Sequence, residues 1–358
     1  MAAVTWKCPN CGGGLTFDPD SQKFECEYCL SQFGKEELER IAPDEGEEQR
    51  DTAVGPEDGA GEGEASGFAP VLYMCPSCGA EIVTDETTAA TFCFYCHNPV
   101  VLKGRLDGAY KPDFVLPFAV EKEKAKEIFL GWLKKKRYVP ADFYSPEQIE
   151  KMTGVYFPYW LYSCQVDGRM EAEATKLRVW DTGDMRYTET QKYDVSRQGQ
   201  MKVEHVTRNA LKKADKQLVE GVMPFDLKEM KPFSMAFLSG FMAEKRDMEK
   251  QEFRQEIETE VKAFAADSLR SSVGPYNNVS IRSQSAQLQN PRWNYALLPV
   301  WTLTYKGKKD GKIYYFACNG QTGKICGKLP VDSMKLWIFF LEIFLPLLAV
   351  LLVAGYLI

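Results

Sequence analysis

The sequence predicts a multidomain protein in which two small metal-held modules precede a larger globular region and an apolar C-terminal segment. Three observations lead to this prediction. Two sets of four cysteines have the same spacing, one pattern of apolar residues occurs twice between residues 110 and 332, and the last 23 residues are almost entirely apolar. We therefore expect two small four-cysteine zinc ribbons, an internally duplicated α+β domain with antiparallel sheets, and one C-terminal transmembrane helix.

Eight of the eleven cysteines form the two sets, each with two Cys-x-x-Cys pairs that are separated by fourteen residues. This is the ligand set of a structural zinc ribbon, because four thiolates fill the tetrahedral shell and leave no position for a reacting water. Core cysteines or disulfides are the alternatives, which the repeated spacing disfavours. We expect two structural Zn²⁺ ions, one held by Cys8, Cys11, Cys26 and Cys29 and one by Cys75, Cys78, Cys93 and Cys96. His97 is an alternative ligand, but four better-spaced thiolates are present.

The two ribbons are predicted at residues 1–34 and 71–104, with an acidic linker at 35–70 between them. Residues 35–66 contain twelve acidic residues against Lys35, Arg40 and Arg50 and lack an apolar period. Such a composition is typical of disordered, self-repelling chain, with one helical turn expected near Lys35–Ile41. The linker is either a solvated spacer or an acidic interaction segment. The small core of the first ribbon is predicted to contain Trp6, Leu15, Phe17, Phe24 and Phe33.

Residues 105–333 are predicted to form the duplicated domain, with copies at about 110–210 and 211–333. Leu116-Pro117-Phe118 recurs as Met223-Pro224-Phe225. A helix is expected after each tripeptide, because both following segments place apolar residues at the spacing of one buried helical face. The first set is Ala125, Ile128, Phe129, Trp132 and Leu133, and the second is Phe233, Ala236, Phe237, Gly240 and Phe241.

Each copy is predicted to continue with a second helix and a hairpin-rich sheet. Ser145 and Pro146 are typical of a helix start, and Gly154 is placed to end that helix. The corresponding helix of the second copy is expected from Lys245 to Leu269, with Phe253, Ile257, Val261, Phe264 and Leu269 on its apolar side. Hairpin turns are expected at Asp167-Gly168 and Asp310-Gly311. Strands are expected around Pro158-Tyr159-Trp160 and Pro299-Val300-Trp301, and at Arg169–Trp180, Met185–Tyr193, Gln200–Val206, Lys312–Cys318 and Lys324–Gly327. The last two of these strands would make Cys318 and Cys326 cross-strand neighbours.

The last segment, 334–358, is predicted to span a membrane. Residues 336–358 would reach about 34 Å as a helix, against about 30 Å for a bilayer core, although a buried helix of a soluble domain is the alternative. Three lysines precede the run and no charge follows it, which favours a single-pass tail anchor of the cell membrane with the N-terminal bulk in the cytoplasm. Glu342 would be protonated, reach the interface or meet a polar group of a partner span, and Pro346 is expected to kink the helix.

No enzyme signature is visible. The chain has two histidines, and a Cys164–His205 pair is the sole nucleophilic arrangement that folding could assemble. The stretch 319–324 lacks the spacing of a phosphate loop, so a hairpin turn is expected there. Net charge is −6, and each ribbon has two more acidic than basic side chains, which opposes nucleic-acid binding. Protein contacts suit the ribbons better, and Phe92, Phe94 and Tyr95 either form a contact patch or cover the metal.

Several stretches of the chain are shared with one group of bacterial proteins. These are the openings CPNCGG and CPSCGA, the stretches VYFPYWLY and LPVWTLTYKGKKDGKIYYFACNGQTGKICGKLP, and the hydrophobic C-terminus. Through them the chain resembles proteins labelled as TFIIB-type zinc-ribbon proteins, and it is similar to a membrane-anchored zinc-ribbon protein of Bacillus-type bacteria. That protein acts beside a flotillin-like SPFH protein and helps bring a phage-shock-type coat protein to the membrane. The resemblance implies an adaptor role, with the eight zinc cysteines as the only residues carried over.

These observations favour a non-enzymatic, tail-anchored scaffold whose ribbons recruit a protein partner to the cytoplasmic membrane face, in keeping with a membrane-stress role. Two other functions stay open. One is a membrane-associated nucleic-acid, transcription or replication factor, which predicts salt-sensitive binding to DNA or RNA. The other is an enzyme, which predicts a cleft with convergent polar side chains between the two copies.

Overall fold

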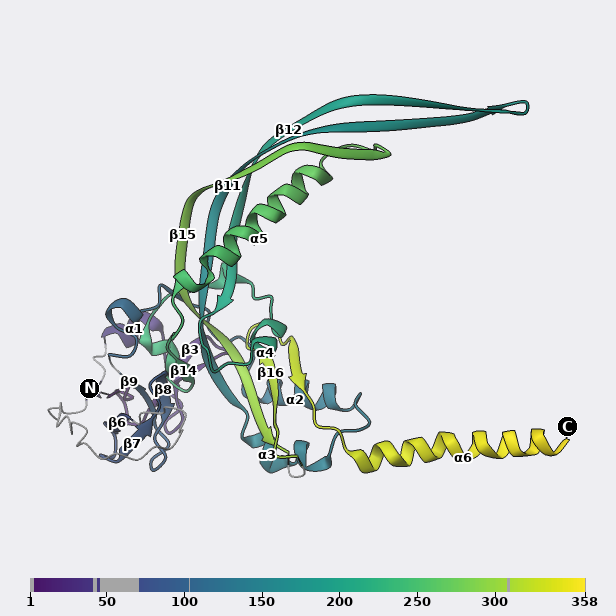
Figure 1. Cartoon of the computed structure of the whole chain (residues 1–358). Coiled ribbons are helices and arrows are strands. Elements are labelled where there is room, and N and C mark those ends of the chain that lie inside the picture. Colours follow the sequence, from purple (N-terminus) through teal and green to yellow (C-terminus); the bar gives the residue numbers. More distant parts are fainter. Residues whose placement is uncertain (1–2, 41–43, 46–70, 103, 308–309, 358) are drawn as a thin grey trace, which may run out of the picture. The chain divides into compact units, whose positions relative to one another are not determined.

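The structure, a computed structural model, describes residues 3–40, 44–45, 71–102, 104–307 and 310–357 (Figure 1). It divides into two compact units. Unit 1 comprises Met1–Pro158, Leu211–Arg246 and Leu297–Ile358, and unit 2 comprises Tyr159–Ala210 and Asp247–Ala296. Each predicted copy of the 105–333 region therefore contributes residues to both units, and the internal duplication stays a prediction. Most of the acidic linker, at 41–43 and 46–70, lies outside the described residues.

The part of the large sheet in unit 1 joins both ribbon regions to the larger domain, and the strands β11 and β15 of this sheet continue into unit 2. Its strand order is β13-β10-β15-β11-β14-β8-β9-β1-β5. Most pairs are antiparallel as predicted, but β14 pairs in parallel with β11, so the sheet is mixed. The strands are β1 (Ala3–Thr5), β5 (Asp44–Glu45), β8 (Thr88–Phe92), β9 (Pro99–Leu102), β10 (Phe114–Val115), β11 (Thr153–Thr182), β13 (Lys231–Pro232), β14 (Met242–Glu244) and β15 (Asn278–Lys306).

Smaller sheets and short helices complete unit 1. The ribbon hairpins are β2-β3-β4 (Leu15–Asp18, Lys23–Cys26, Gln32–Phe33) and β6-β7 (Val71–Met74, Glu81–Thr84). Strands β16 (Ile313–Asn319) and β17 (Ile325–Lys328) extend β15 as a meander. The short helices are α1 (Lys35–Arg40), α4 (Lys216–Gly221), η1 (Gly108–Tyr110), η2 (Ala141–Tyr144) and η3 (Leu227–Glu229). Helix α1 confirms the helical turn expected at the start of the linker.

Two predicted helices of the first copy are present. Helix α2 (Lys122–Leu133) buries Ala125, Phe129 and Leu133, and the Phe129 ring lies 4.5 Å from that of Phe316. Helix α3 (Pro146–Glu150) begins as predicted, because the Gln148 N–H donates to Ser145 Oγ. Gly154 does not end this helix. It lies in β11, where a Cβ would be 2.6 Å from the Phe241 ring, so the glycine is needed for close packing.

The helix predicted over Phe233–Phe241 is wrong. The segment contains a single 3-10 turn, η4 (Met235–Leu238), and lies between the strands β13 and β14. Pro232 already lies in a strand opposite Phe114, and Gly240 has φ 89°, which ends any helical run. The apolar residues have helical spacing, yet Phe237 and Phe241 both pack against Phe17, and Phe241 also stacks on Phe118 with ring centroids 4.2 Å apart. Tertiary contacts, and not the apolar periodicity, therefore determine the conformation of this segment.

Unit 2 consists of a long sheet with one helix against it (Figure 1). Strand β12 (Met185–Asn209) pairs antiparallel with β11 over almost its full length. The predicted turn at Asp167-Gly168 is wrong, because Gly168 lies in mid-strand opposite Gly199, and the turn occurs at Gly183, with φ 59°. A Cβ on Gly168 would be 2.8 Å from Leu269 Cδ1, so this glycine makes room for the helix. The Asp310-Gly311 turn, between β15 and β16, is confirmed, with Gly311 at φ 66°.

Helix α5 (Lys250–Ser271) confirms the long helix of the second copy, starting five residues later than predicted. Glu249 and Glu252 form a reciprocal capping box that sets this start. The buried side follows a strict four-residue step and contains Ala265 instead of the predicted Phe264, which is 61% exposed. The buried residues are Phe253, Ile257, Val261, Ala265 and Leu269.

The chain ends in α6 (Ser333–Leu357), a helix of 25 residues that reaches about 38 Å. Its apolar window, Ser333–Leu352, has none of its residues buried. The helix runs through Pro346. By length and composition α6 is therefore able to cross a membrane, and this separates it from the amphipathic helices of the two units.

Candidate metal centres

The first cysteine group is assembled by two tight turns joined by the β2-β3 hairpin. One turn closes when the Gly12 N–H donates to the Cys8 carbonyl, and the other when the Leu30 N–H donates to the Cys26 carbonyl. The Cys8 and Cys29 sulfurs are 3.5 Å apart, and the Cys11 and Cys26 sulfurs 3.4 Å. Four sulfurs around one zinc at about 2.3 Å would be about 3.8 Å apart, so these distances fit a shared ion closely.

The second group repeats this construction. The Gly79 N–H donates to the Cys75 carbonyl and the His97 N–H to the Cys93 carbonyl. The sulfurs are 3.7 Å apart in both the Cys75–Cys96 and the Cys78–Cys93 pair. His97, with φ 58°, occupies the left-handed position that closes the turn, as Leu30 does in the first group. Within the described residues the gathered ligand atoms are the four sulfurs, without His97.

The environment of the thiols suits a cation at each group. Hydrogen bonds with the Ser31 hydroxyl and N–H lower the pKa of Cys29 to about 6. Burial raises the pKa of Cys93, but the backbone N–H groups of Cys96 and Tyr95 outweigh it and bring the pKa to about 7. Burial and the neighbouring sulfurs raise the pKa of Cys96 to about 12. Four thiolates at these distances repel one another, so each group can be fully deprotonated only around a bound cation.

Each ribbon is tied to the sheet of unit 1. Val4 of β1 lies opposite Val101 of β9, which follows the second cysteine group, so the two ribbon regions are hydrogen-bonded to each other. On the other side of the second ribbon, Ala90 of β8 lies opposite Ala243 of β14. The cysteine groups and their hairpins, which form separate small sheets, are thus connected to the large sheet through β1, β8 and β9, and loss of a metal ion should destabilise these strands.

The first ribbon docks on the segment that the sequence wrongly predicted as a helix. The ring of Phe237 in η4 lies 5.4 Å from Phe17 and 6.1 Å from Phe24, and the ammonium groups of Lys35 and Lys231 lie within 5.7 Å of the same ring. The Ser239 hydroxyl donates to the Leu15 carbonyl, and the Phe17 N–H donates to the Ser239 carbonyl. Phe237 is therefore the centre of this contact.

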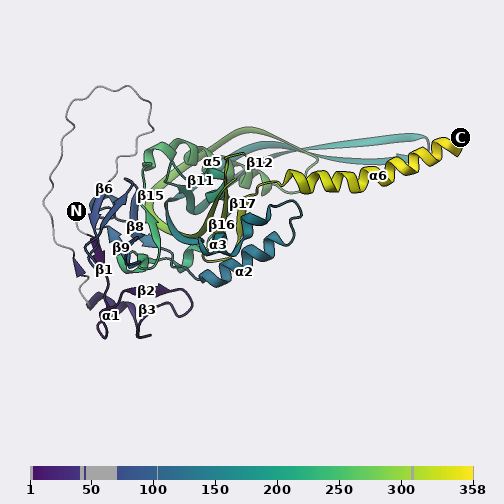
Figure 2. The same cartoon turned by 90° about the horizontal axis from the view of Figure 1, so that it is seen from below.

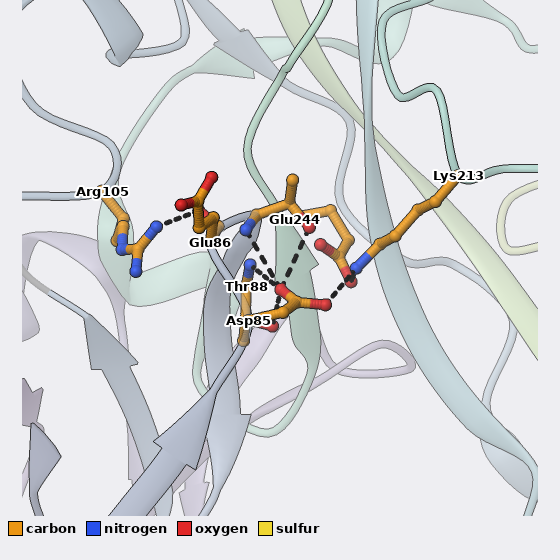
Figure 3. A network of polar contacts seen from close by, with 7 residues as sticks. Asp85, Glu86, Thr88, Arg105, Lys213 and Glu244 are labelled. Atoms are coloured by element: carbon orange, nitrogen blue, oxygen red, sulfur yellow. Dashed lines mark hydrogen bonds and ion pairs between the residues drawn. The ribbon is translucent and has the colours of Figure 1, made fainter. Parts of the chain in front are cut away.

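The second ribbon is fastened by a network of charged groups, shown in Figure 3. Lys213 Nζ lies 2.7 Å from Asp85 Oδ2 in the turn before β8 and 2.8 Å from Glu244 Oε1 at the end of β14. The Thr88 N–H and hydroxyl also donate to Asp85. No sequence pattern predicted this network, because Lys213 and Asp85 are 128 positions apart.

Burial and ion pairing set the protonation of this network. Burial raises the pKa of Asp85, but hydrogen bonds from Lys213 and Thr88 outweigh it and hold the pKa well below its usual range. Burial also raises the pKa of Glu244, although the charge of Lys213 acts in the opposite direction. The two carboxylates raise the pKa of Lys213 above its ordinary value against the effect of burial. Lys213 thus stays charged between two carboxyl groups.

Aromatic side chains stand outside the second cysteine group. Phe94 is 73% and Tyr95 74% exposed, so neither covers the sulfurs, whereas Phe92 is half-buried. The β6-β7 hairpin beside them turns Leu72, Met74 and Val83 outward, while Tyr73 and Ile82 join the core. We call Phe94, Tyr95, Leu72, Met74 and Val83 the ribbon 2 apolar surface. The sequence indicated its aromatic part, but not the hairpin part.

The remaining cysteines do not add a metal group within the described residues. Cys164 is buried, and burial raises its pKa, so it is a poor nucleophile beside His205. Cys318 lies opposite Ile325, and Cys326 lies opposite Ala317. The symmetry of the turn predicted that the two thiols are cross-strand neighbours. They do lie on adjacent strands, but they are not directly opposite each other.

The fold and the cysteine groups together define a sheet-rich multidomain protein with two four-cysteine groups and an apolar C-terminal helix. The chain is 30% identical over 339 residues to a protein of Bacillus subtilis (strain 168) named uncharacterized protein YdjG, with 94% of this chain and 93% of YdjG covered. The chain therefore belongs to the same family as YdjG. No protein-family model matches the chain, and no solved structure matches it.

Proposed function

We propose that this chain is a membrane-anchored scaffold whose second ribbon recruits a protein partner to the cytoplasmic face of the membrane. The observation that carries the proposal is the exposure of Phe94 and Tyr95 on a turn held by four cysteine sulfurs. Large aromatic side chains fixed on a rigid support are typical anchors of protein interfaces, because little conformational entropy is lost when they are buried.

Zinc is the proposed metal of both centres. Four sulfurs in a closed tetrahedral arrangement favour Zn²⁺ or an iron–sulfur centre over cations that prefer oxygen ligands, and the repeated turns are those of structural zinc sites. The ions would hold the turns and do no chemistry. Metal analysis of the purified chain should give two zinc ions per molecule, and a content of one zinc, or of iron, would contradict this assignment.

Helix α6 is the proposed anchor. Apart from Ser333, Lys335 and Glu342, its residues up to Leu352 are apolar, and Trp337 near its start is 63% exposed, where an indole suits the lipid interface. Lys324 and Lys328 precede α6 and Lys335 lies in its first turn, which favours a cytoplasmic position for the preceding chain. Anchoring would confine the ribbon 2 apolar surface to the membrane and raise its effective concentration for a membrane-bound partner.

The partner class follows from the resemblance to the membrane-anchored zinc-ribbon protein of Bacillus-type bacteria. An SPFH-like or a phage-shock-type protein is therefore the partner to test first. The second ribbon also has two more acidic than basic side chains, Glu81 among the acidic ones, which suits a protein and opposes a nucleic acid, whose phosphates require a basic surface.

The test is affinity purification from detergent-solubilised membranes with the Phe94→Ser/Tyr95→Ser variant. We expect a co-purified SPFH-like or phage-shock-type protein with the unchanged chain and a loss of at least tenfold with the variant. Tyr187→Ser, which removes an exposed aromatic ring in unit 2, is the matched control and should retain the partner. Equal recovery with both variants, or recovery of neither protein class, would refute the proposal.

A further inference from the structure

Unit 2 contains a polar cavity that neither the metal centres nor the proposed scaffold role uses. Its volume is about 250 Å³, and it lies across β11, β12 and β15. The side chains that could bind a ligand come from all three strands. They are Ser163, Lys202, His205, Asn290, Arg292 and Asn294.

Two residues of the cavity have a backbone conformation that non-glycine residues rarely adopt. His205 has φ 56° and Asn290 has φ 51°, and they lie on the two strands that flank β11. The register of β11 and β12 shifts next to His205, between Tyr162 and Cys164. Bulges of this kind re-aim side chains, and strained residues cluster at binding sites. Here both distortions occur at one cavity.

Hydrogen bonds hold the distorted residues in place. The His205 N–H donates to Ser163 Oγ at 3.0 Å, and Asn290 Nδ2 donates to Gln165 Oε1 at 3.3 Å. On β15, Trp293 packs against Tyr162 with ring centroids 4.9 Å apart. Since side chains alternate along a strand, its neighbours Arg292 and Asn294 are on the opposite side of the sheet, where the cavity lies.

The charges of the cavity favour an anion. Lys202 and Glu204 both line the cavity and form an ion pair at 2.5 Å, so their charges cancel, whereas the Arg292 guanidinium has no hydrogen bond or ion pair in the part of the chain that the structure describes. The His205 imidazole also lines the cavity and can donate a hydrogen bond from a ring N–H. The amide groups of Asn290 and Asn294 supply neutral donors beside them.

We propose that this cavity is a binding site for a phosphate group. A guanidinium matches the oxygens of phosphate with two parallel hydrogen bonds, and the imidazole and amide donors surround the remaining oxygens. The volume is below the roughly 300–1,000 Å³ of sites that enclose a whole organic ligand, so the cavity fits a single phosphate or phosphomonoester head. Such a group belongs either to a free solute or to a phosphomonoester lipid.

The test is calorimetric titration of the metal-loaded full chain in neutral detergent micelles at constant ionic strength. The probes are inorganic phosphate, acetate and dihexanoyl phosphatidic acid. We expect saturable binding of phosphate that is weakened roughly tenfold to a hundredfold by Arg292→Gln, since charge-assisted hydrogen bonds are lost. Arg186→Gln, which removes the same charge at the far end of the hairpin, should change the affinity less than twofold. His205→Asn should weaken binding while keeping a residue that tolerates positive φ.

The outcomes separate the sources of the phosphate. Tighter binding of phosphatidic acid than of inorganic phosphate identifies a lipid headgroup, and equal binding identifies a free phosphate. Absence of saturable phosphate binding, stronger binding of acetate, or equal weakening by Arg292→Gln and Arg186→Gln would overturn the proposal. An unchanged circular dichroism spectrum of Arg292→Gln, expected for an exposed side chain, keeps the comparison valid.

Discussion

At the scale of single residues, the second ribbon depends on a cation placed between two carboxyl groups. Asp85 lies in the turn before β8 and Glu244 at the end of β14, and Lys213 contacts both (Figure 3). Pairs of this kind contribute little net stability when complete, yet removing one partner leaves a buried charge without compensation. The Glu244 side chain is 11% exposed, so its carboxylate would carry most of this cost.

Replacing Lys213 with Met should therefore destabilise unit 1. The Lys213 side chain is 37% exposed, and water reduces the penalty to about 1–3 kcal/mol. Lys216→Met is the matched control, because the Lys216–Glu220 pair is exposed and its loss should change stability by less than about 0.5 kcal/mol. Thermal unfolding in detergent micelles measures both, and equal midpoints for the two variants would contradict the role of Lys213.

A second prediction at the scale of single residues concerns Ser31. Its hydroxyl lies 3.2 Å from the Cys29 sulfur, and it lowers the pKa of that thiol. Ser31→Ala should reduce the zinc affinity of the first group by about tenfold, as expected for a group that orients a metal ligand. Competition with a coloured chelator measures the loss. Ser21→Ala, which removes a hydroxyl bonded to Asp18 in the same ribbon, should leave both zinc affinities unchanged.

At the scale of elements, the short turn η4 holds the first ribbon through one ring. Phe237 is 2% exposed and contacts Phe17 and Phe24. Phe237→Ala should lower the free energy of unfolding by about 3–5 kcal/mol, because a buried ring leaves a cavity. The matched control is Phe264→Ala on α5, which should cost less than about 0.5 kcal/mol. A larger loss of unfolding free energy with Phe264→Ala would contradict the assignment of the buried side of α5.

The same elements show what the sequence can predict here. The cysteine groups and α2 were predictable, because ligand spacing and a continuous helical period are local signals. The η4 segment was not, because Phe237 and Phe241 have helical spacing but are placed by contacts with residues far away in sequence, such as Phe17. The Asp167-Gly168 pair has turn chemistry, yet Gly168 is small to admit Leu269. The Lys213 network joins residues far apart in sequence, and no local pattern marks such a contact.

At the scale of the whole molecule, the proposed function requires that one chain combines an anchor with a partner surface. Figures 1 and 2 label the two elements concerned, α6 at the C-terminal end and β6 of the second ribbon. Helix α6 has no buried residue in its apolar window, and the ribbon 2 apolar surface belongs to a different part of the same unit. Exposed apolar area of this kind disfavours a soluble isolated chain and is typical of surfaces that are covered by lipid or protein.

Removal of α6 should release the chain from the membrane. A variant that ends at Asp332 is expected in the soluble fraction after carbonate extraction of cells, whereas the full chain should stay with the membranes. The truncation should leave two zinc ions per chain, because both cysteine groups lie far upstream in sequence. Retention of the truncated chain in the membrane fraction would show that α6 is not the anchor.

The recruitment of a partner at the membrane is tested most directly by photo-crosslinking from position 94. Phe94 is replaced by a photoreactive phenylalanine in the full chain, the cells are illuminated, and adducts are identified by mass spectrometry in membrane and soluble fractions. The account predicts one dominant protein adduct in the membrane fraction, which is lost when Cys75 and Cys78 are both replaced by Ser. Absence of an adduct, or one that persists without the metal centre, would contradict it.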